Sequence, residues 1–441
     1  MSSRDLRSLI DATPWVDTHE HLVEERQRLR SGGYTFPELM TGGSLTIPSS
    51  WTALLVDYSL QDLASAGMPR SAIAELTREE RSPVEQWDAA AEYLQAARAT
   101  GYLRAVDLTT ERLFGMRLSR ETCEAVDARL RALRVEGYYA HVLCDVSNVA
   151  RAQVHSIECD PFCETQTPEL LQQDLALVPL AMGRHAPAEQ ASGIEVGSLD
   201  DYLAVLEWCF ERYAARAVAA KCVWAYLRPL AVDVPDVPPR REFLRLREGI
   251  ADLRERRRVE DFLFQRCVDL ATAAGLPVKL HLGYLAANGD RRLRHVYDHV
   301  RDVTPIVQAN PRTTFVLMHM AWPQQEQLLA LAKHQPNVVV DLCWAWILAP
   351  LATEDFVQRF LTCVPATKLL CFGGDYLVVE NVVGHAEIAR RGLQAALERL
   401  VARGWLTSDA ALALVPLLMH GNAERIFPPR LADGSEPLDA K

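Results

Sequence analysis

The chain has 441 residues, a length that fits two average domains or one large α/β barrel with insertions. Hydrophobic residues make up 49% of it, which is enough for a large core and too little for a membrane protein. Its net charge of −11 argues against nucleic acid or an anionic membrane as the main partner.

Several further features of the sequence predict a cytoplasmic protein. The ten cysteines are scattered and form no Cys-x-x-Cys pair, which is typical of free thiols in a reducing compartment. Residues 1–11 alternate in charge and contain no apolar signal segment. The longest apolar stretch, residues 338–352, is interrupted by Asp341 and Pro350 and is too short for a membrane helix.

Short β-like runs alternate with longer helical patterns along the chain. Two regions break this rhythm: residues 23–81 are predicted to be a partly helical insertion, and residues 145–197 a long connection of the kind that often acts as a lid. Ser82, Pro83 and Glu85 predict a capped helix start. The predicted strands cover residues 15–21, 103–108, 138–144, 217–225, 277–282, 313–319, 337–342 and 368–372.

Eight such units in series are typical of an α/β fold of the (β/α)8 TIM-barrel type, with helical and loop insertions at the catalytic face. The alternative is a doubly wound sheet that binds a nucleotide, but no Gly-x-Gly-x-x-Gly follows a strand and no Walker A sequence is present. We predict a single barrel domain over residues 1–430 and a flexible tail over residues 431–441.

Ionisable side chains lie at or near the ends of five predicted strands, where TIM barrels carry their active sites. In residues 15–21, the alternation of a strand places Asp17 on the same face as the two following histidines. A buried unpaired polar group costs about 1–3 kcal/mol, so five strands that accept this cost at one end indicate a shared partner such as a metal ion. The residues concerned are His19, His21, Lys221, Lys279, His281, His319 and Asp375.

The ordered set Asp17-Thr18-His19-Glu20-His21, His281, His319 and Asp375 resembles the amidohydrolase superfamily. The resemblance is closest to its amidohydrolase-related branch, which includes decarboxylases and uronate-isomerase-like members. It extends from residue 13 to residue 427, apart from the two interrupting regions. Further features of that branch are His281-Leu282-Gly283, Gly374-Asp375 and Gly421-Asn422-Ala423 with Phe427.

The resemblance implies roles for individual residues. His19, His21 and Asp375 would bind a divalent metal, and Asp375 would also act as general base on a metal-bound water. His281 would be a further ligand, and His319 either a ligand of a second metal or a hydrogen-bonding acid. Lys221 stands where phosphotriesterase-like members carry a carboxylated lysine that bridges two metals.

Imidazole and carboxylate ligands suit one or two divalent transition-metal ions, with zinc as the first choice and iron, manganese or cobalt as alternatives. The default expectation is one ion held by His19, His21, His281 and Asp375. If Lys221 is carboxylated, His281 and His319 would serve a second ion. The alternative is that Lys221 pairs with a carboxylate such as Asp145 and binds no metal.

The side chains that follow strands four to eight are candidates for substrate binding. Tyr226 and Arg228 are placed to hold an anionic group. Tyr284, Trp322 and Tyr376 would form an aromatic rim, or would instead pack the loops above the barrel.

The predicted function is that of a metal-dependent hydrolase that cleaves an amide, lactone or ester bond of a small carboxylated molecule through a metal-activated water. The alternative is a non-hydrolytic decarboxylase or sugar-acid (uronate-type) isomerase with the same ligands. A non-catalytic binding protein on a degenerate barrel is a third class, against which the complete ligand set argues. The expected partner is a small-molecule substrate, with no nucleic acid or membrane; a homodimer is left open.

Overall fold

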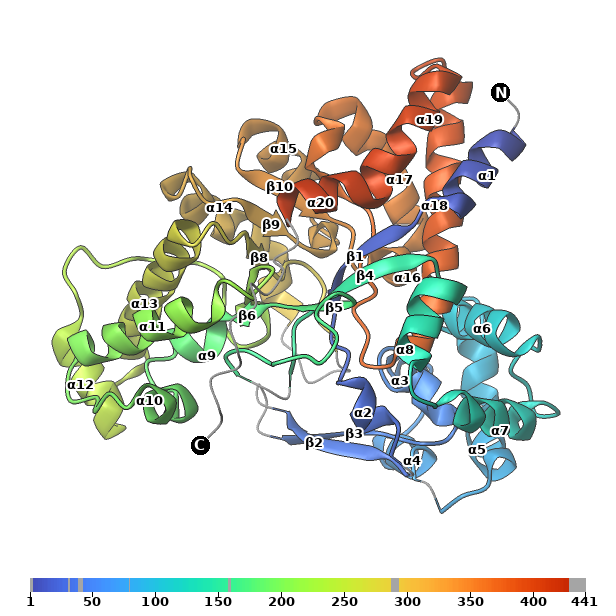
Figure 1. The fold of residues 1–441 in the computed structure, drawn as a ribbon, viewed down its shortest axis with the longest axis horizontal. Helices are drawn as coiled ribbons and strands as arrows, with labels where there is room; N and C mark the ends of the chain where they lie inside the picture. The colour runs from blue at the N-terminus through green and yellow to red at the C-terminus, as the bar shows by residue number, and fades with distance from the viewer. Residues whose placement is uncertain are drawn as a thin grey trace.

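Parallel strands form a ring at the centre of the molecule, in chain order (Figure 1). The structure is a computed structural model and describes residues 3–30, 32–38, 43–78, 80–157, 160–286 and 293–427. The strands are β1 (Trp15–Glu20), β4 (Val149–Val154), β5 (Leu171–Gln173) continued as β6 (Leu175–Ala176), β7 (Ala220–Cys222), β8 (Val278–Leu280), β9 (Phe315–Leu317), β10 (Val338–Asp341) and β11 (Leu369–Leu370).

Individual backbone hydrogen bonds complete the ring at two places. Asp174 N donates to the carbonyl of Val154, and Leu175 N donates to that of Ala219, so β5 and β6 join β4 to β7. Between β11 and β1, Thr18 N donates to Phe372 O at 3.0 Å, and Asp375 N donates to His19 O at 2.8 Å. The predicted (β/α)8 barrel is confirmed.

Two of the eight predicted strands are wrong. Residues 103–108 lie inside helix α6 (Gly101–Phe114), and residues 138–144 form α8 (Tyr138–Ala140) and the start of a π-helical turn (His141–Val146). Most residues of helix α6 are buried. The helix also packs closely at its start, where a Cβ on Gly101 would lie 2.0 Å from the carbonyl oxygen of Ile347. A short apolar run of this kind cannot be told from a buried strand by its periodicity.

The true second and third strands lie in the region predicted to be a long connection, so that prediction is wrong for β4 and β5–β6. Their sequences are polar, with Gln153, Gln172, Gln173 and Asp174 all buried. A strand that places amides and a carboxylate in a polar barrel interior lacks the apolar pattern by which strands are recognised.

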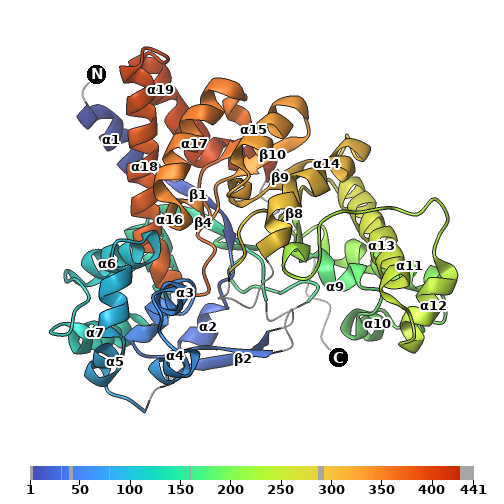
Figure 2. The ribbon, with the colours of Figure 1, turned by 180° about the vertical axis from the view of Figure 1, so that it is seen from behind.

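Most of the helical mass lies in two groups on opposite sides of the strands. In Figure 1 the insertion helices α5–α7 lie at the lower right and α10–α13 at the left; Figure 2 shows the same separation from behind. The first group follows β1 and contains α2 (Glu25–Arg28), the hairpin β2 (Tyr34–Glu38) with β3 (Gly43–Ile47), α3 (Ser59–Ser65), α4 (Arg70–Leu76), α5 (Pro83–Ala97), α6 and α7 (Cys123–Leu133). The predicted capping box of Ser82 and Glu85 begins α5.

The other helices, with α10–α13 among them, cover the outside of the barrel. They are α1 (Ser3–Ala12), α9 (Leu177–Ala181), α10 (Ala186–Ser192), α11 (Leu199–Tyr213), α12 (Arg240–Glu248), α13 (Leu253–Ala273), α14 (His299–Ala309), α15 (Gln325–His334), α16 (Ala345–Leu348), α17 (Pro350–Cys363), α18 (Val382–Ala402), α19 (Ser408–Pro416) and α20 (Asn422–Ile426). None of the described helices combines the length and apolar composition needed to span a bilayer. The described cysteines are all free thiols, and the predicted tail over residues 431–441 lies outside the described residues.

Helix α20 closes the barrel at the end opposite the predicted site. Asn422 Nδ2 donates to the carbonyls of Ala366 and Leu369, which fixes the helix under the strands. Phe427 then lies under the interior, with the ammonium of Lys279 5.1 Å from its ring centre. Its apolar neighbours are Val16, Val218, Ala219, Val316, Val339, Leu370, Ala423 and Ile426.

We predict that Phe427→Ala lowers the free energy of unfolding by about 3–5 kcal/mol, because it removes the side chain that fills this end of the barrel. Urea denaturation measures the change. Trp405→Ala is the control, since Trp405 is 61% exposed and its loss should cost about 0.5 kcal/mol or less. Equal losses in the two variants would contradict the role of Phe427.

Candidate metal centre

Three side chains converge at the carboxyl end of the barrel strands. His19 lies on β1, His21 follows it, and Asp375 follows β11. Their ligand atoms all lie within 4.8 Å of one another. Asp375 Oδ1 is 3.3 Å from His19 Nε2 and 3.1 Å from His21 Nε2.

The orientation of His21 fits a metal ion. Its Nδ1 lies 2.8 Å from the carbonyl oxygen of His155, which can only accept, so Nδ1 carries the proton. In the neutral ring, Nε2 then presents a lone pair to the carboxylate of Asp375. Two electron-rich atoms 3.1 Å apart repel unless a cation lies against both. The geometry of the three residues, like their ligand chemistry, therefore fits a divalent cation.

Charge in this group supports the same conclusion. Burial and the neighbouring Lys221 hold the pKa of His19 well below its usual range, so its ring is neutral. Burial alone would raise the pKa of Asp375, but its contacts with His19 and His21 hold it well below its usual range. Asp375 is therefore an anion at neutral pH and can bind a cation or accept a proton.

The backbone before Asp375 explains the two glycines in its motif. A Cβ on Gly374 would lie 1.9 Å from Glu20 Oε1, and one on Gly373 would lie 2.8 Å from the side chain of Cys343. Only glycine permits this close approach to β1. Asp375 itself has φ +65°, and the hydroxyl of Tyr58 donates to its carbonyl oxygen.

Lys221 points into the barrel towards the metal centre. Its Nζ lies 3.4 Å from His19 Nε2 and also contacts the sulfur of Met318. Burial lowers the pKa of Lys221 to about 8. Asp145, the alternative partner, instead pairs with His141 at the surface.

Lys279 is not available for the same task. Its Nζ lies 2.9 Å from both carboxylate oxygens of Asp174 and donates to the carbonyl of Thr18 at 2.9 Å. Asp174 also has an oxygen 3.9 Å from His19 Nδ1. This buried ion pair therefore lies next to His19.

His281 and His319 lie in contact beside the three converging residues. His319 Nε2 lies 2.9 Å from His281 Nδ1, and the outer nitrogens lie 3.0 Å from Cys343 O and 2.9 Å from Tyr284 O. All three contacts could be hydrogen bonds only if the two rings together carried three protons on nitrogen, whereas two neutral imidazoles carry two. Burial lowers the pKa of both histidines, to about 4 for His319.

The described residues contain a second group with ligand geometry, made of His319, Cys343 and Asp375. His281 is in neither group. Its role as a ligand, and the roles predicted for His319, stay predictions.

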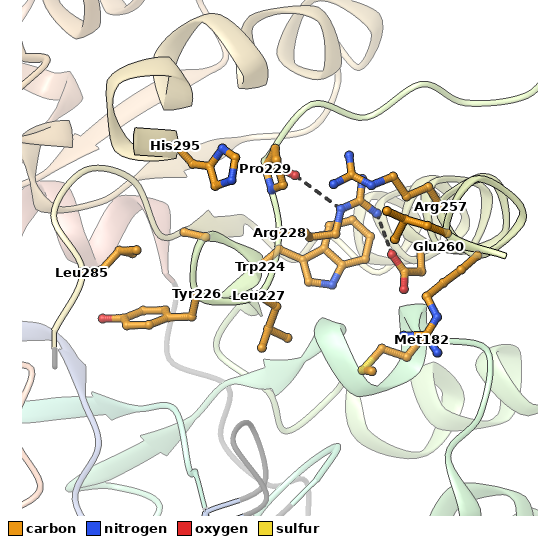
Figure 3. A pocket seen from close by; sticks show the side chains of 13 residues that line it. Met182, Trp224, Tyr226, Leu227, Arg228, Pro229, Arg257, Glu260, Leu285 and His295 are labelled. Carbon is orange, nitrogen blue, oxygen red and sulfur yellow. Dashed lines mark hydrogen bonds and ion pairs between the residues drawn. The ribbon is translucent and has the colours of Figure 1, made fainter. Parts of the chain in front are cut away.

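Arg228 and Tyr226 line a cavity of about 510 Å³ beside the barrel mouth (Figure 3). The guanidinium of Arg228 is fully engaged: it pairs with Glu260 at 2.9 Å and Asp261 at 2.6 Å and lies 4.4 Å over the ring of Trp224. It is therefore already neutralised by protein carboxylates. The ring of Tyr226 lies 4.6 Å from that of His281, between this cavity and the metal centre.

The predicted aromatic rim divides into two parts. Tyr284 and Trp322 are half-buried and pack edge to face at 5.6 Å, as a rim requires. Tyr376 is buried against Tyr58 and His385 instead. Substrate binding by any of them stays a prediction.

The sequence reasoning missed four residues of this centre. Asp57 accepts a hydrogen bond from Leu377 N, and Tyr58 donates to the carbonyl oxygen of Asp375. Asp174 and His155 lie close to the ring of His19. His155 directly follows β4, so recognising that strand would have identified it. Tyr58 and Asp57 lie in an insertion and carry no signal that relates them to Asp375.

Comparison with known proteins identifies the relationship. Residues 211–428 match the model of the family described as amidohydrolase. This part of the chain is similar to that family. The matched region contains Lys221, His281, His319 and Asp375 and confirms the resemblance seen in the sequence.

One curated relative is protein fluG of Emericella nidulans, which is 23% identical over 443 residues. The alignment covers 96% of this chain and 46% of fluG, so the chain spans about half the length of that protein.

Solved structures share the fold over nearly the whole chain. A uronate isomerase of Thermotoga maritima is 15% identical, with 96% of this chain and 97% of that one covered and a TM-score of 0.76. A glucuronate isomerase of Caulobacter crescentus is 16% identical, with 96% of this chain and 93% of that one covered and a TM-score of 0.72. A putative metal-dependent hydrolase of Lactobacillus casei is 14% identical, with 96% of this chain and 97% of that one covered and a TM-score of 0.61.

We predict that His19→Ala weakens zinc binding by at least about 100-fold, since even outer partners of metal ligands contribute about 10- to 100-fold. Equilibrium dialysis with metal analysis measures the affinity. His141→Ala is the matched control, because His141 is an exposed histidine paired with Asp145. Unchanged affinity in His19→Ala would place the metal elsewhere.

Proposed function

We propose that this protein is a metal-dependent isomerase that interconverts the aldehyde and ketone forms of a small sugar acid of the uronate type. The observation that carries the proposal is the set of proton-transferring groups around one carboxylate: Lys221 and His319 lie close to Asp375 and its two imidazoles. The likeness to two uronate isomerases over the full length of the chain supports it.

The reaction needs two proton transfers and neither gains nor loses an atom. In the forward direction the carboxylate of Asp375 takes the proton from the carbon next to the aldehyde and returns it to the aldehyde carbon. The proton of the hydroxyl group moves to the former aldehyde oxygen. Lys221, whose pKa is lowered to about 8, and the neutral imidazole of His319 are the groups placed to carry that second proton.

His19, His21 and Asp375 would hold the metal, with zinc as the first choice and iron, manganese or cobalt as alternatives. When bound, such an ion polarises the oxygens of the substrate and makes the neighbouring C–H more acidic. The protein supplies the orientation: His155 fixes the ring of His21, and Asp174 lies against that of His19.

Hydrolysis of an amide, lactone or ester is the second candidate. The amidohydrolase match and the anionic state of Asp375, which suits a base that activates water, favour it. The two reactions differ in whether water is consumed.

We predict that the metal-loaded protein converts D-glucuronate to its ketose and that Asp375→Asn lowers kcat by about 100- to 10,000-fold, because the amide cannot accept the proton. Proton NMR in D2O follows the product and the deuterium that it gains. Asp145→Asn, at a surface carboxylate that is 72% exposed, should retain activity. No conversion with any of the four metals, together with turnover of a lactone or amide, would replace this proposal by the hydrolytic one.

A second ion would require Lys221 to react with carbon dioxide, which turns the amine into a carbamate with two ligand oxygens. In that case 13C-bicarbonate would give a carbamate NMR signal that is absent in Lys221→Gln and present in Lys333→Gln, at a surface lysine, and Lys221 would no longer carry the second proton. Metal analysis would then give about two ions per chain. If no signal appears and one ion is bound, the site is mononuclear.

A further inference from the structure

A cavity of about 120 Å³ lies beside the metal centre, at the ends of β4, β6 and β7. Most of the residues in its walls are apolar. The walls are formed by Ile157, Val178, Pro179, Met182, Val223 and Leu227, with His155 on one side. It is separate from the larger cavity around Trp224, although Met182 and Leu227 line both.

His155 connects this cavity to the metal centre. Its carbonyl oxygen accepts the Nδ1 proton of His21, and its ring centre lies 5.8 Å from that of His21 and 6.3 Å from that of His19. The side chain is 96% buried, since only 4% is exposed, and its Nδ1 has no hydrogen-bond partner among the described residues. His155 is therefore both a neighbour of the metal centre and part of the wall of the cavity.

The chemistry of the walls selects the group that fits. Apart from His155, the polar lining residues are Ser156 and Asp160, and burial raises the pKa of Asp160 to about 6. Each methylene transferred here from water gains about fourfold in affinity. A hydroxyl that loses its water hydrogen bonds here without a replacement costs about fivefold or more.

We propose that this cavity binds a hydrocarbon segment of the substrate. The preferred substrate is then a hydroxycarbonyl acid that carries a deoxygenated or alkyl part near the metal, and D-glucuronate, with a hydroxyl on every chain carbon, would be converted but bound more weakly. The assignment of the substrate as a hydroxycarbonyl acid rests on the proposed function, whereas the preference of the cavity for hydrocarbon does not.

Two carboxylates of equal size test the preference: pentanoate, and 4-hydroxybutanoate, which has a hydroxyl in place of the terminal methyl group. Calorimetric titration of the zinc-saturated protein measures both affinities. We expect pentanoate to bind about tenfold more tightly. Equal or tighter binding of 4-hydroxybutanoate would overturn the proposal. Because no turnover is measured, failure of the isomerase assay leaves this result standing, and the reverse holds as well.

Two variants place the binding in the cavity. Val223→Phe and Val178→Phe fill it from different elements, and each should abolish the advantage of pentanoate. Val237→Phe is the control, because Val237 is 69% exposed and lies outside the cavity. Thermal denaturation identifies a variant that does not fold, in which case the other decides. An unchanged advantage in a folded cavity variant would show that pentanoate binds elsewhere.

Discussion

The metal centre depends on the seam at which the chain after β11 meets β1. His19 and Asp375 come from opposite ends of the sequence, and the backbone bond from Asp375 N to His19 O holds them in register. Acidic groups of β1 strengthen the seam: Asp17 Oδ1 accepts from Gly374 N, and Glu20 Oε2 accepts from Tyr376 N at 2.6 Å. The hydrogen bonds that close the barrel are therefore those that assemble the ligands.

The protonation states of Asp17 and Glu20 determine the charge of this seam. Burial raises the pKa of Asp17 to about 7, and burial together with Asp17 raises that of Glu20 well above its usual range. Asp17 is therefore partly protonated at neutral pH, and the negative charge of the pair is reduced. Asp375 remains the anionic member of the group, which keeps its negative charge next to the two imidazoles.

Backbone strain is concentrated at the same end of the barrel. His319, Trp344 and Asp375 follow β9, β10 and β11, and all three have positive φ, at +59°, +64° and +65°. Such conformations cost about 1–3 kcal/mol each and persist only where contacts enforce them. Here Tyr58 contributes such contacts, because its ring stacks on that of Trp344 at 4.9 Å and its hydroxyl bonds the backbone of Asp375.

The sequence predicted the barrel and six of its strands, because those strands are apolar and end in ionisable residues. It predicted the convergence of His19, His21 and Asp375, since the ends of parallel strands meet at one rim. It missed β4 and β5–β6, whose buried Gln153, Gln173 and Asp174 carry no apolar pattern, and hence also His155. Contacts made by an insertion, such as those of Tyr58, depend on tertiary packing that no local pattern encodes.

The position of the seam also sets the order in which the molecule can be built. The hydroxyl of Thr18 donates to the carbonyl oxygen of Phe372, 354 positions further along the chain. Helix α20 can pack under the strands only after β11 has been synthesised. Contacts of such long range form late, because the loop between them must first be ordered. On the ribosome, His19 and His21 would emerge long before Asp375. The newly made amino-terminal half therefore exposes two imidazoles without their carboxylate, and selective metal uptake would follow translation of residues 369–427.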